Sequence, residues 1–324
     1  MTPSTAATDA TGSRVTQAPR KKSPAFDANY RKPRLKLPAG ACDTHFHIFG
    51  PQARFPFMPN HIFPDVDFGD ATLEDWVRMQ DALGLSRGLH IQTQMYGYSY
   101  ELMLHAQCRF PDRLRAVVIP SPDITDRELT LLTDAGVVGA RFSYRMFDEI
   151  DEEMVARTAE RGWSMHYLLA PGEDGKRWHK KILATPGKFV LEHAGNPDPA
   201  RGINDSNFRF VLECLDTGRC WVKMSPRFSA QPVLPFSDTD PFHLKLVEHA
   251  PNRLLWGSDW PHPIYFNPMP NDADLMDIML RWVPDEAVRE RIFVHNPAEA
   301  FGFPAIDLST HRSSNSHSQQ MVNK

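Results

Sequence analysis

The chain has 324 residues, of which 41% are hydrophobic and 23% are charged, and its formal net charge is −4. This composition is typical of a globular protein with a sizeable core. Because the balance is acidic and no basic stripe with interleaved aromatic residues occurs, nucleic acid and membrane are excluded as expected partners. A small molecule is the partner that we expect, and assembly into a homo-oligomer stays open.

The cysteines and the first residues of the sequence predict the cellular location of the protein. Four cysteines occur without C-x-x-C spacing, which argues against a disulfide framework or a structural zinc site and favours a reducing cytoplasm. No run approaches the roughly 18 apolar residues of a membrane span, and the start lacks the apolar core of a secretion signal. The polar segments 1–24 and 307–324 are predicted to be disordered tails around one domain, residues 25–306.

Between these tails, short apolar runs alternate with segments of helical spacing. Leu73, Trp76 and Leu83 are an example of that spacing. The predicted strands are 42–48, 88–93, 115–120, 137–142, 164–169, 188–192, 220–224 and 253–257. Eight repeats in about 260 residues predict the α/β class and a single (β/α)8 (TIM) barrel. A doubly wound open sheet is the rival, but no G-x-G-x-x-G or G-x-x-x-x-G-K loop occurs.

The barrel predicts that functional side chains collect at the carboxyl ends of its strands. Polar residues do follow the predicted strands there: His45, His47, Thr93, Gln94, Arg141, His193, Lys223, Arg227 and Asp259. His45 and His47 lie two residues apart on a run that is apolar on both sides, "ACDTHFHIFG". Alternation along a strand therefore predicts that both imidazoles face one buried space.

Four motifs carry a resemblance to a known family: "CDTHFHIFGPQARFPF", "GARF", "EHAGNPD" and "WGSDWPHP". From about Ala41 to Phe301 the chain is similar to the amidohydrolase superfamily, and within it to the branch that contains 2-pyrone-4,6-dicarboxylate lactonase. H-x-H on the first strand is a weak signal alone, but it is strong together with G-[ST]-D-x-P-H on the last. The resemblance implies a (β/α)8 barrel that hydrolyses a lactone.

These residue types also suit lactone hydrolysis on chemical grounds. Asp259 is predicted to be the base that takes the proton of water, and His45, His47 and His193 to be the electrophilic side. Arg141 and Arg227 suit substrate carboxylates. Gln94 and Tyr96, with Phe63 and Leu168, match positions where the resembled lactonase holds its substrate, so the exact lactone stays open.

Each residue also has a purely structural interpretation. The histidines could bond backbone carbonyls, Asp259 could cap a segment or pair with His262, and Arg141 could form a salt bridge with a nearby acid. His166 is expected to be a core histidine. A non-catalytic binder is a further alternative, although no member of the predicted set is missing.

The metal content follows from the resemblance. Superfamily members with two metal ions bridge them through a lysine at the end of strand four, where this chain has Arg141, which cannot ligate a cation. One zinc held by His45, His47 and Asp259 stays open. The resembled lactonase works without metal, so no metal is expected to be required; a zinc-dependent decarboxylase and a sugar-acid lactonase are the alternatives.

Two proline-rich aromatic loops, "QARFPFMPNHIF" and "PHPIYFNPMP", follow the first and last predicted strands. Because these strands are neighbours in a closed barrel, the loops are predicted to meet at the rim over the site.

Overall fold

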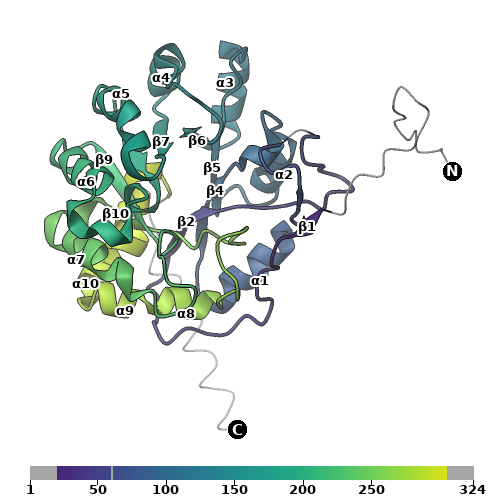
Figure 1. Cartoon of the computed structure of the whole chain (residues 1–324). Coiled ribbons are helices and arrows are strands. Elements are labelled where there is room, and N and C mark those ends of the chain that lie inside the picture. The colour runs from purple at the N-terminus through teal and green to yellow at the C-terminus, as the bar shows by residue number, and fades with distance from the viewer. Residues whose placement is uncertain (1–19, 60, 305–324) are drawn as a thin grey trace, which may run out of the picture.

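The computed structural model describes residues 20–59 and 61–304, and it confirms the predicted barrel. Eight parallel strands run around it in chain order (Figure 1). They are β2 (Cys42–Phe46), β4 (Arg87–Ile91), β5 (Leu114–Val118), β6 (Val137–Ser143), β7 (Ser164–Leu168), β8 (Phe189–Leu191), β9 (Cys220–Met224) and β10 (Leu254–Trp256). Each overlaps one predicted strand.

The first and last strands meet at their carboxyl ends. The backbone N–H of Asp259 donates to the carbonyl of His45 at 2.8 Å, and the N–H of His47 donates to the carbonyl of Trp260 at 2.8 Å. The Thr44 hydroxyl donates to the carbonyl of Trp256 at 2.7 Å. These bonds close the barrel beside His45, His47 and Asp259.

Helices surround the strands. They are α1 (Leu73–Leu83), α2 (Glu101–Arg109), α3 (Asp126–Asp134), α4 (Glu152–Ala159), α5 (His179–Leu183), α6 (Ser206–Asp216), α7 (Asp240–His249), α8 (Asp272–Asp277), α9 (Met279–Trp282), α10 (Glu286–Glu290) and α11 (Asn296–Phe301). Shorter turns are η1 (Gln94–Tyr96), η2 (Gly172–Trp178), η3 (Glu192–Gly195), η4 (Pro199–Asn204), η5 (Ser237–Thr239), η6 (Pro251–Arg253) and η7 (Arg291–His295). No helix among the described residues combines the length and apolar character needed to cross a bilayer.

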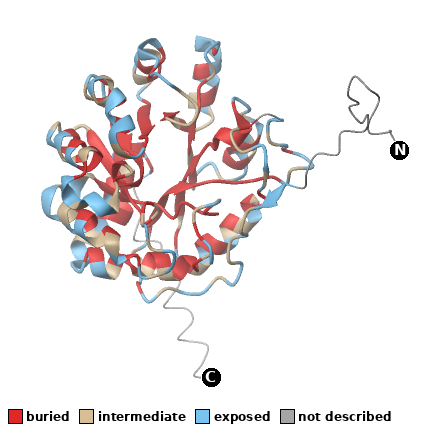
Figure 2. Cartoon of the chain, viewed as in Figure 1, coloured by how far each residue is buried: buried red, intermediate tan, exposed pale blue. Residues whose placement is uncertain are grey.

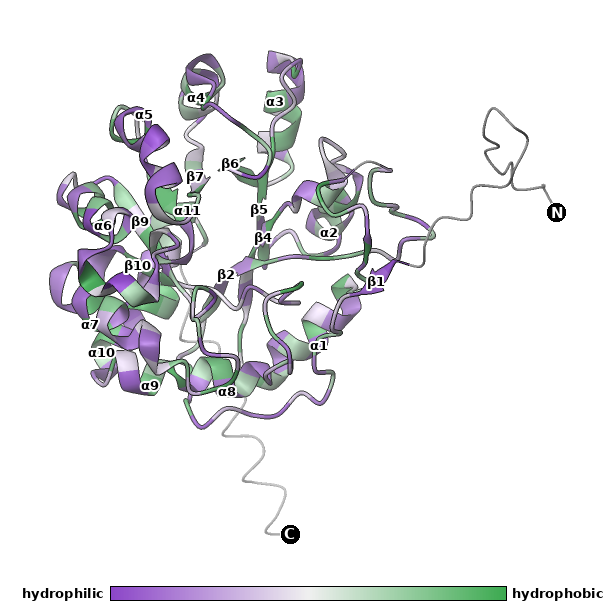
Figure 3. Ribbon diagram, in the orientation of Figure 1, coloured by the Kyte–Doolittle hydropathy of each residue, from purple (hydrophilic) through white to green (hydrophobic). Residues whose placement is uncertain are grey.

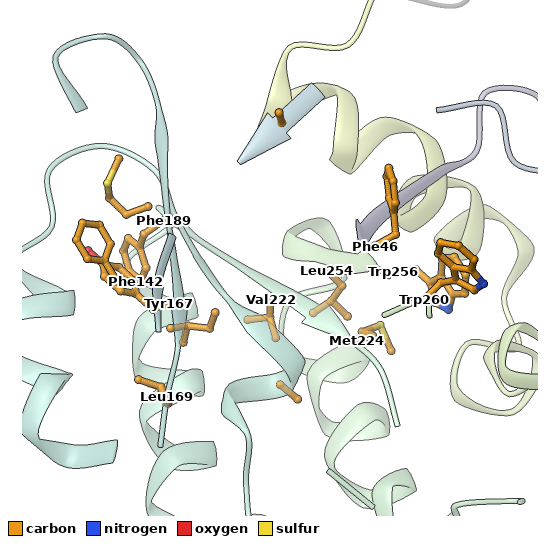
Figure 4. Packing of buried hydrophobic residues seen from close by; sticks show 14 of the residues in the cluster. Phe46, Phe142, Tyr167, Leu169, Phe189, Val222, Met224, Leu254, Trp256 and Trp260 are labelled. Atoms are coloured by element: carbon orange, nitrogen blue, oxygen red, sulfur yellow. The ribbon is translucent and has the colours of Figure 1, made fainter. Parts of the chain in front are cut away.

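The hydrophobic core has two parts. Large side chains fill the layer between strands and helices, with Phe142, Tyr167 and Phe189 on one side and Trp256 and Trp260 on the other (Figure 4). A smaller cluster fills the lower barrel interior, among its members Cys42, Leu89, Val117, Trp221 and Phe301. The strands are accordingly buried while the outer helix faces are exposed (Figure 2), and the helices carry both hydrophobic and hydrophilic residues (Figure 3).

Strand β2 departs from simple alternation. Its pairing with β4 shifts register between Asp43 and Phe46, and the strand ends at Phe46. Cys42 therefore lies in the barrel interior while Phe46 packs in the outer layer, although alternation would put both on one face. The irregularity turns His45 inward, so the predicted shared direction of His45 and His47 has a cause that alternation alone did not include.

The last residues of the predicted N-terminal tail take part in the described fold. β1 (Lys21–Lys22) pairs in parallel with β3 (Val66–Asp67), and the N–H groups of Lys21 and Ser23 donate to Asp65 and Asp67. Residues 20–24 therefore belong to the fold, because backbone pairing holds them despite their polar side chains. The rest of the predicted tail 1–24, and all of the predicted tail 307–324, lie outside the described residues.

Candidate active site

The four predicted catalytic residues come together at the carboxyl end of the barrel. Oδ1 of Asp259 lies 3.4 Å from Nε2 of His45, 3.5 Å from Nε2 of His47 and 3.8 Å from Nε2 of His193. All four residues are at most 6% exposed. Among the described residues, Nε2 of His45, Nε2 of His193 and Oδ2 of Asp259 have no hydrogen-bond partner. Buried polar atoms of this kind need a partner such as water or a substrate.

Two of these residues have unusual backbones. His193, in η3, has φ of 50°, and Asp259, after β10, has φ of 61°. The left-handed region costs a non-glycine residue free energy, and such residues concentrate at functional sites.

A glycine permits the close contact between the last and first strands. A Cβ placed on Gly257 would lie 2.5 Å from Cβ of His45 and 3.0 Å from its backbone nitrogen. Any larger residue at this position would displace His45. Gly257 therefore allows His45 to reach Asp259.

The Nδ1 atoms of the three histidines, which point away from Asp259, have different partners. Nδ1 of His47 lies 2.7 Å from the carbonyl oxygen of Ile91, and Nδ1 of His193 lies 2.8 Å from Oγ of Ser225. Nδ1 of His45 instead lies 3.1 Å from Nζ of Lys223. Because a carbonyl can only accept, Nδ1 of His47 carries a proton.

An ion network lies in the barrel interior beneath the histidines. Glu192, fully buried, accepts from Nε and Nη2 of Arg141 at 2.8 to 3.2 Å, and Nη1 of Arg141 donates to the carbonyl of Gln92 at 3.0 Å. Oε1 of Glu192 also lies 3.8 Å from Nδ1 of His45. Glu192 was not predicted. Arg141 lines the cavity, but its charge is balanced by Glu192, as in the salt-bridge alternative; direct substrate contact by Arg141 stays a prediction.

Arg227 is the arginine that lies beside Asp259. Its Nε lies 3.3 Å from Oδ2 of Asp259, and its guanidinium lies 4.0 Å from the centre of the Tyr265 ring and contacts the Tyr265 hydroxyl. Among the described residues, Nε and Nη1 of Arg227 have no hydrogen-bond partner. Arg145, which was not singled out from the sequence, also approaches the Tyr265 hydroxyl, at 3.4 Å.

Some of these groups line one cavity, whose empty space is about 390 Å³ when its opening to solvent is included. Its walls are His47, Phe63, Thr93, Gln94, Met95, Arg141, Arg145, Leu168, Arg227, Asp259, Pro263, Ile264 and Tyr265. Phe63 comes from the loop after β2, and Tyr265 from the loop after β10. The predicted meeting of these two loops over the site is therefore confirmed for these residues. Phe57 packs on Phe49 and Tyr96 instead.

Some of the other residues considered from the sequence line the cavity, and others lie outside it. Gln94 lines the cavity and donates to Oγ of Ser143 at 2.7 Å. Tyr96 is not brought to this cavity; its hydroxyl accepts from the N–H of Gly50 at 2.7 Å, which fixes the loop after β2. His166 is fully buried in β7 beside Ser164, as expected of a core histidine, and His262 pairs with Asp272 at 2.9 Å rather than with Asp259.

Burial and neighbouring charges set the protonation of the site. Burial, and then the nearby Lys223, holds the pKa of His45 well below its usual value. Burial and Arg227 do the same to the pKa of His193. Burial alone would raise the pKa of Asp259, but His193 and Arg227 outweigh it, so the net pKa lies below its ordinary range. The imidazoles of His45 and His193 are therefore neutral beside an ionised carboxylate.

Distance alone would allow a metal ion here. The ligand atoms of His45, His47 and Asp259 lie within 4.8 Å of one another, and those of His45, Glu192 and His193 form a second such group. A metal-binding histidine, however, normally donates the N–H of its other ring nitrogen, the one that does not bind the metal, to an acceptor. His47 has such an acceptor in Ile91, whereas His45 has the amine of Lys223. The donor set therefore does not fit a cation at His45.

Comparisons with known proteins agree with this geometry. The model of the Amidohydrolase family matches residues 42–303. A 4-sulfomuconolactone hydrolase of Rhizobium radiobacter is 34% identical over 280 residues, 82% of this chain and 91% of that protein. A 2-pyrone-4,6-dicarboxylate hydrolase of Comamonas testosteroni is 32% identical over 290 residues, 85% and 94% of the two chains. A solved Agrobacterium tumefaciens structure has a TM-score of 0.73 at 26% identity, covering 85% of this chain and all of that one. The chain belongs to the Amidohydrolase family.

Proposed function

We propose that this protein is a hydrolase that opens a lactone carrying a carboxylate or similar acid group, with Asp259 as the base. The observation that carries the proposal is the buried Asp259 carboxylate, which faces three imidazole nitrogens and Arg227; Asp259, Arg227 and His47 line one cavity. The two hydrolases named above act on a sulfomuconolactone and on a pyrone dicarboxylate, both acidic lactones, which supports this substrate class and a role in aromatic catabolism.

The reaction needs no covalent intermediate with the protein. Asp259 takes a proton from water while the water oxygen bonds to the lactone carbonyl carbon, and the carbonyl electrons move to its oxygen. Hydrogen-bond donors among the neutral histidines stabilise this oxyanion. When the oxyanion collapses, the ring C–O bond breaks and the alkoxide receives the proton from Asp259. The product is an open chain with a new hydroxyl and a new carboxylic acid, which releases its proton to solvent and becomes a carboxylate.

Substrate binding would also tune the base. A carboxylate with a pKa far below neutral is a weak base. Arg227 contributes to that low pKa of Asp259 through Nε, and its Nη1, which has no hydrogen-bond partner among the described residues, can bind an acid group of the substrate. An anion that draws the guanidinium away from Asp259 would raise the pKa of Asp259 when the substrate is in place.

We further propose that the reaction requires no metal, because His45 has an amine rather than an acceptor behind it. A cytoplasmic location is proposed from the cysteines: all four are free, and three are buried.

Hydrolysis of a lactone panel tests the proposed function. Pyrone dicarboxylate, muconolactones and aldonolactones should be assayed at neutral pH, with protein purified in chelator. We expect turnover of acidic aromatic-derived lactones and little turnover of their uncharged analogues. Release of carbon dioxide that depends on added zinc would favour the decarboxylase instead, and preference for aldonolactones would favour the sugar-acid lactonase.

Replacing Arg227 with Met should raise KM for the best substrate about 10- to 100-fold, because a buried hydrogen bond to a charged group is lost. Steady-state kinetics would measure this, with Arg209→Met as the control at a position away from the cavity. An unchanged KM would remove Arg227 from the substrate site.

Two substitutions in the loop after β10 should have different effects, one on stability and the other on substrate selectivity. Phe266 is 6% exposed and packs on Phe236 at 5.2 Å, so Phe266→Ala should cost about 3 kcal/mol of stability. Tyr265 contacts Arg227 and lines the cavity, so Tyr265→Ala should change the ratio of kcat/KM between lactones while shifting Tm little. Thermal unfolding and the lactone panel measure the two effects; the reverse pattern would show that Tyr265 serves packing.

A further inference from the structure

The His45 ring has partners of opposite character at its two nitrogens. Nζ of Lys223 lies 3.1 Å from Nδ1, and Oδ1 of Asp259 lies 3.4 Å from Nε2. The ammonium form of lysine can only donate, whereas an ionised carboxylate can only accept. Burial lowers the pKa of Lys223 to about 7, so the ammonium is the main form below that pH. The arrangement that suits both contacts is a proton on Nε2 and a lone pair on Nδ1. The reverse tautomer would set the Nδ1 hydrogen of His45 against the hydrogens of the Lys223 ammonium, and a lone pair against the Asp259 carboxylate.

The neighbouring His47 is held the other way round. The carbonyl of Ile91 requires a proton on Nδ1 of His47. Two histidines that look equivalent in the H-x-H motif therefore differ at Nδ1: that of His45 faces a donor, and that of His47 faces an acceptor.

We propose that Lys223 is a positioning residue that keeps the proton on Nε2 of His45, so that this nitrogen donates to the lactone oxyanion and cannot ligate a cation. The first half of this inference rests on the proposed lactone hydrolysis; the second half stands without it. Lys223 is the group whose chemistry accounts for the poor fit of His45 to a metal.

The placement of Lys223 supports this role. It is 1% exposed in β9, and its side chain points into the barrel interior where Glu192 and Arg141 already pair. The Glu192 carboxylate therefore has a cation whether or not Lys223 is present. Replacing Lys223 with Met should accordingly leave the main buried ion pair intact and allow the chain to fold.

The tautomers can be measured in the unchanged protein. Long-range 1H–15N correlation spectra of 15N-histidine-labelled protein distinguish Nε2–H from Nδ1–H rings, and His45→Gln and His47→Gln variants assign the two signals. We expect Nε2–H for His45 and Nδ1–H for His47. A proton on Nδ1 of His45 would overturn the proposal. Because no lactone is involved, this result is independent of the proposed function.

Zinc binding gives a second readout. In Lys223→Met, Nδ1 of His45 is free to carry the proton, and Nε2 becomes a ligand beside His47 and Asp259. Calorimetric titration with zinc after chelator treatment should show affinity about 10- to 100-fold higher than in the unchanged protein. The gain should vanish in the double variant with His45→Gln, and Lys188→Met, an exposed lysine, should behave like the unchanged protein. Equal zinc affinity with and without Lys223 would contradict the proposal.

Discussion

Replacing Asp259 with Asn is expected to lower kcat for the best lactone by about 10²- to 10⁴-fold, because the amide keeps the shape of the side chain and cannot take a proton from water. Stopped assays with high enzyme concentration would measure the residual rate. Circular dichroism should show an unchanged fold, since the backbone bond from Asp259 to the carbonyl of His45 does not involve the side chain.

Asp272→Asn is the matched control for this variant. Asp272 is also a buried carboxylate, and it pairs with His262 at 2.9 Å outside the cavity. Its replacement should leave kcat within a few-fold of the original. Full activity in Asp259→Asn would contradict the mechanism, and equal losses in both variants would point to loop structure rather than to proton transfer.

Replacing Glu192 with Gln should have the largest effect on stability, about 3–5 kcal/mol of unfolding free energy. Glu192 is fully buried and pairs with Arg141, so its neutralisation leaves the Arg141 guanidinium in the barrel interior without its carboxylate partner. Urea unfolding of both proteins at neutral pH measures the difference. Asp126→Asn provides the control, since that carboxylate pairs with Arg157 at the surface and its side chain is 72% exposed; its effect should be small.

The stability difference between the unchanged protein and the Glu192→Gln variant should also depend on pH. Burial would raise the pKa of Glu192, but Arg141 and Lys223 outweigh it and hold the net pKa below the ordinary 4.5. A carboxyl whose pKa is lower in the folded state stabilises the fold above its unfolded pKa, and that contribution is lost as the pH falls below it. The stability difference should thus be largest near neutral pH and shrink below about pH 4.5. A constant difference across this range would show that shape, not charge, accounts for the effect.

The barrel and its four central residues were predictable for a physical reason. Parallel strands that are buried on both faces leave continuous apolar runs, and the barrel brings their carboxyl ends to one rim, so His45, His193 and Asp259 could be placed together from their positions after strands. Motif resemblance strengthened the same assignment.

What the sequence did not reveal depends on contacts between distant segments. The pairing of Arg141 with Glu192 joins residues 51 positions apart, and nothing local distinguishes a glutamate that meets an arginine from one that faces water. The register shift in β2 is a single-residue irregularity that the pattern of apolar residues does not report. Tyr96 was placed near substrate by resemblance, but its hydroxyl is used by Gly50, a bond set by the path of a long loop.

The arginines of the cavity give the site a charge opposite to that of the whole chain. Arg145 and Arg227 converge on the Tyr265 hydroxyl, while Asp259 is the one carboxylate among the described lining residues and the Glu192 beneath them offsets Arg141. An anionic lactone thus meets a molecule of net charge −4 at long range and a positive pocket at short range. Dissolved ions screen charges more than about 10 Å away at 0.1 M ionic strength but act weakly on buried groups. At physiological salt the encounter is therefore governed by the positive pocket, and the acidic surface does little to repel the substrate.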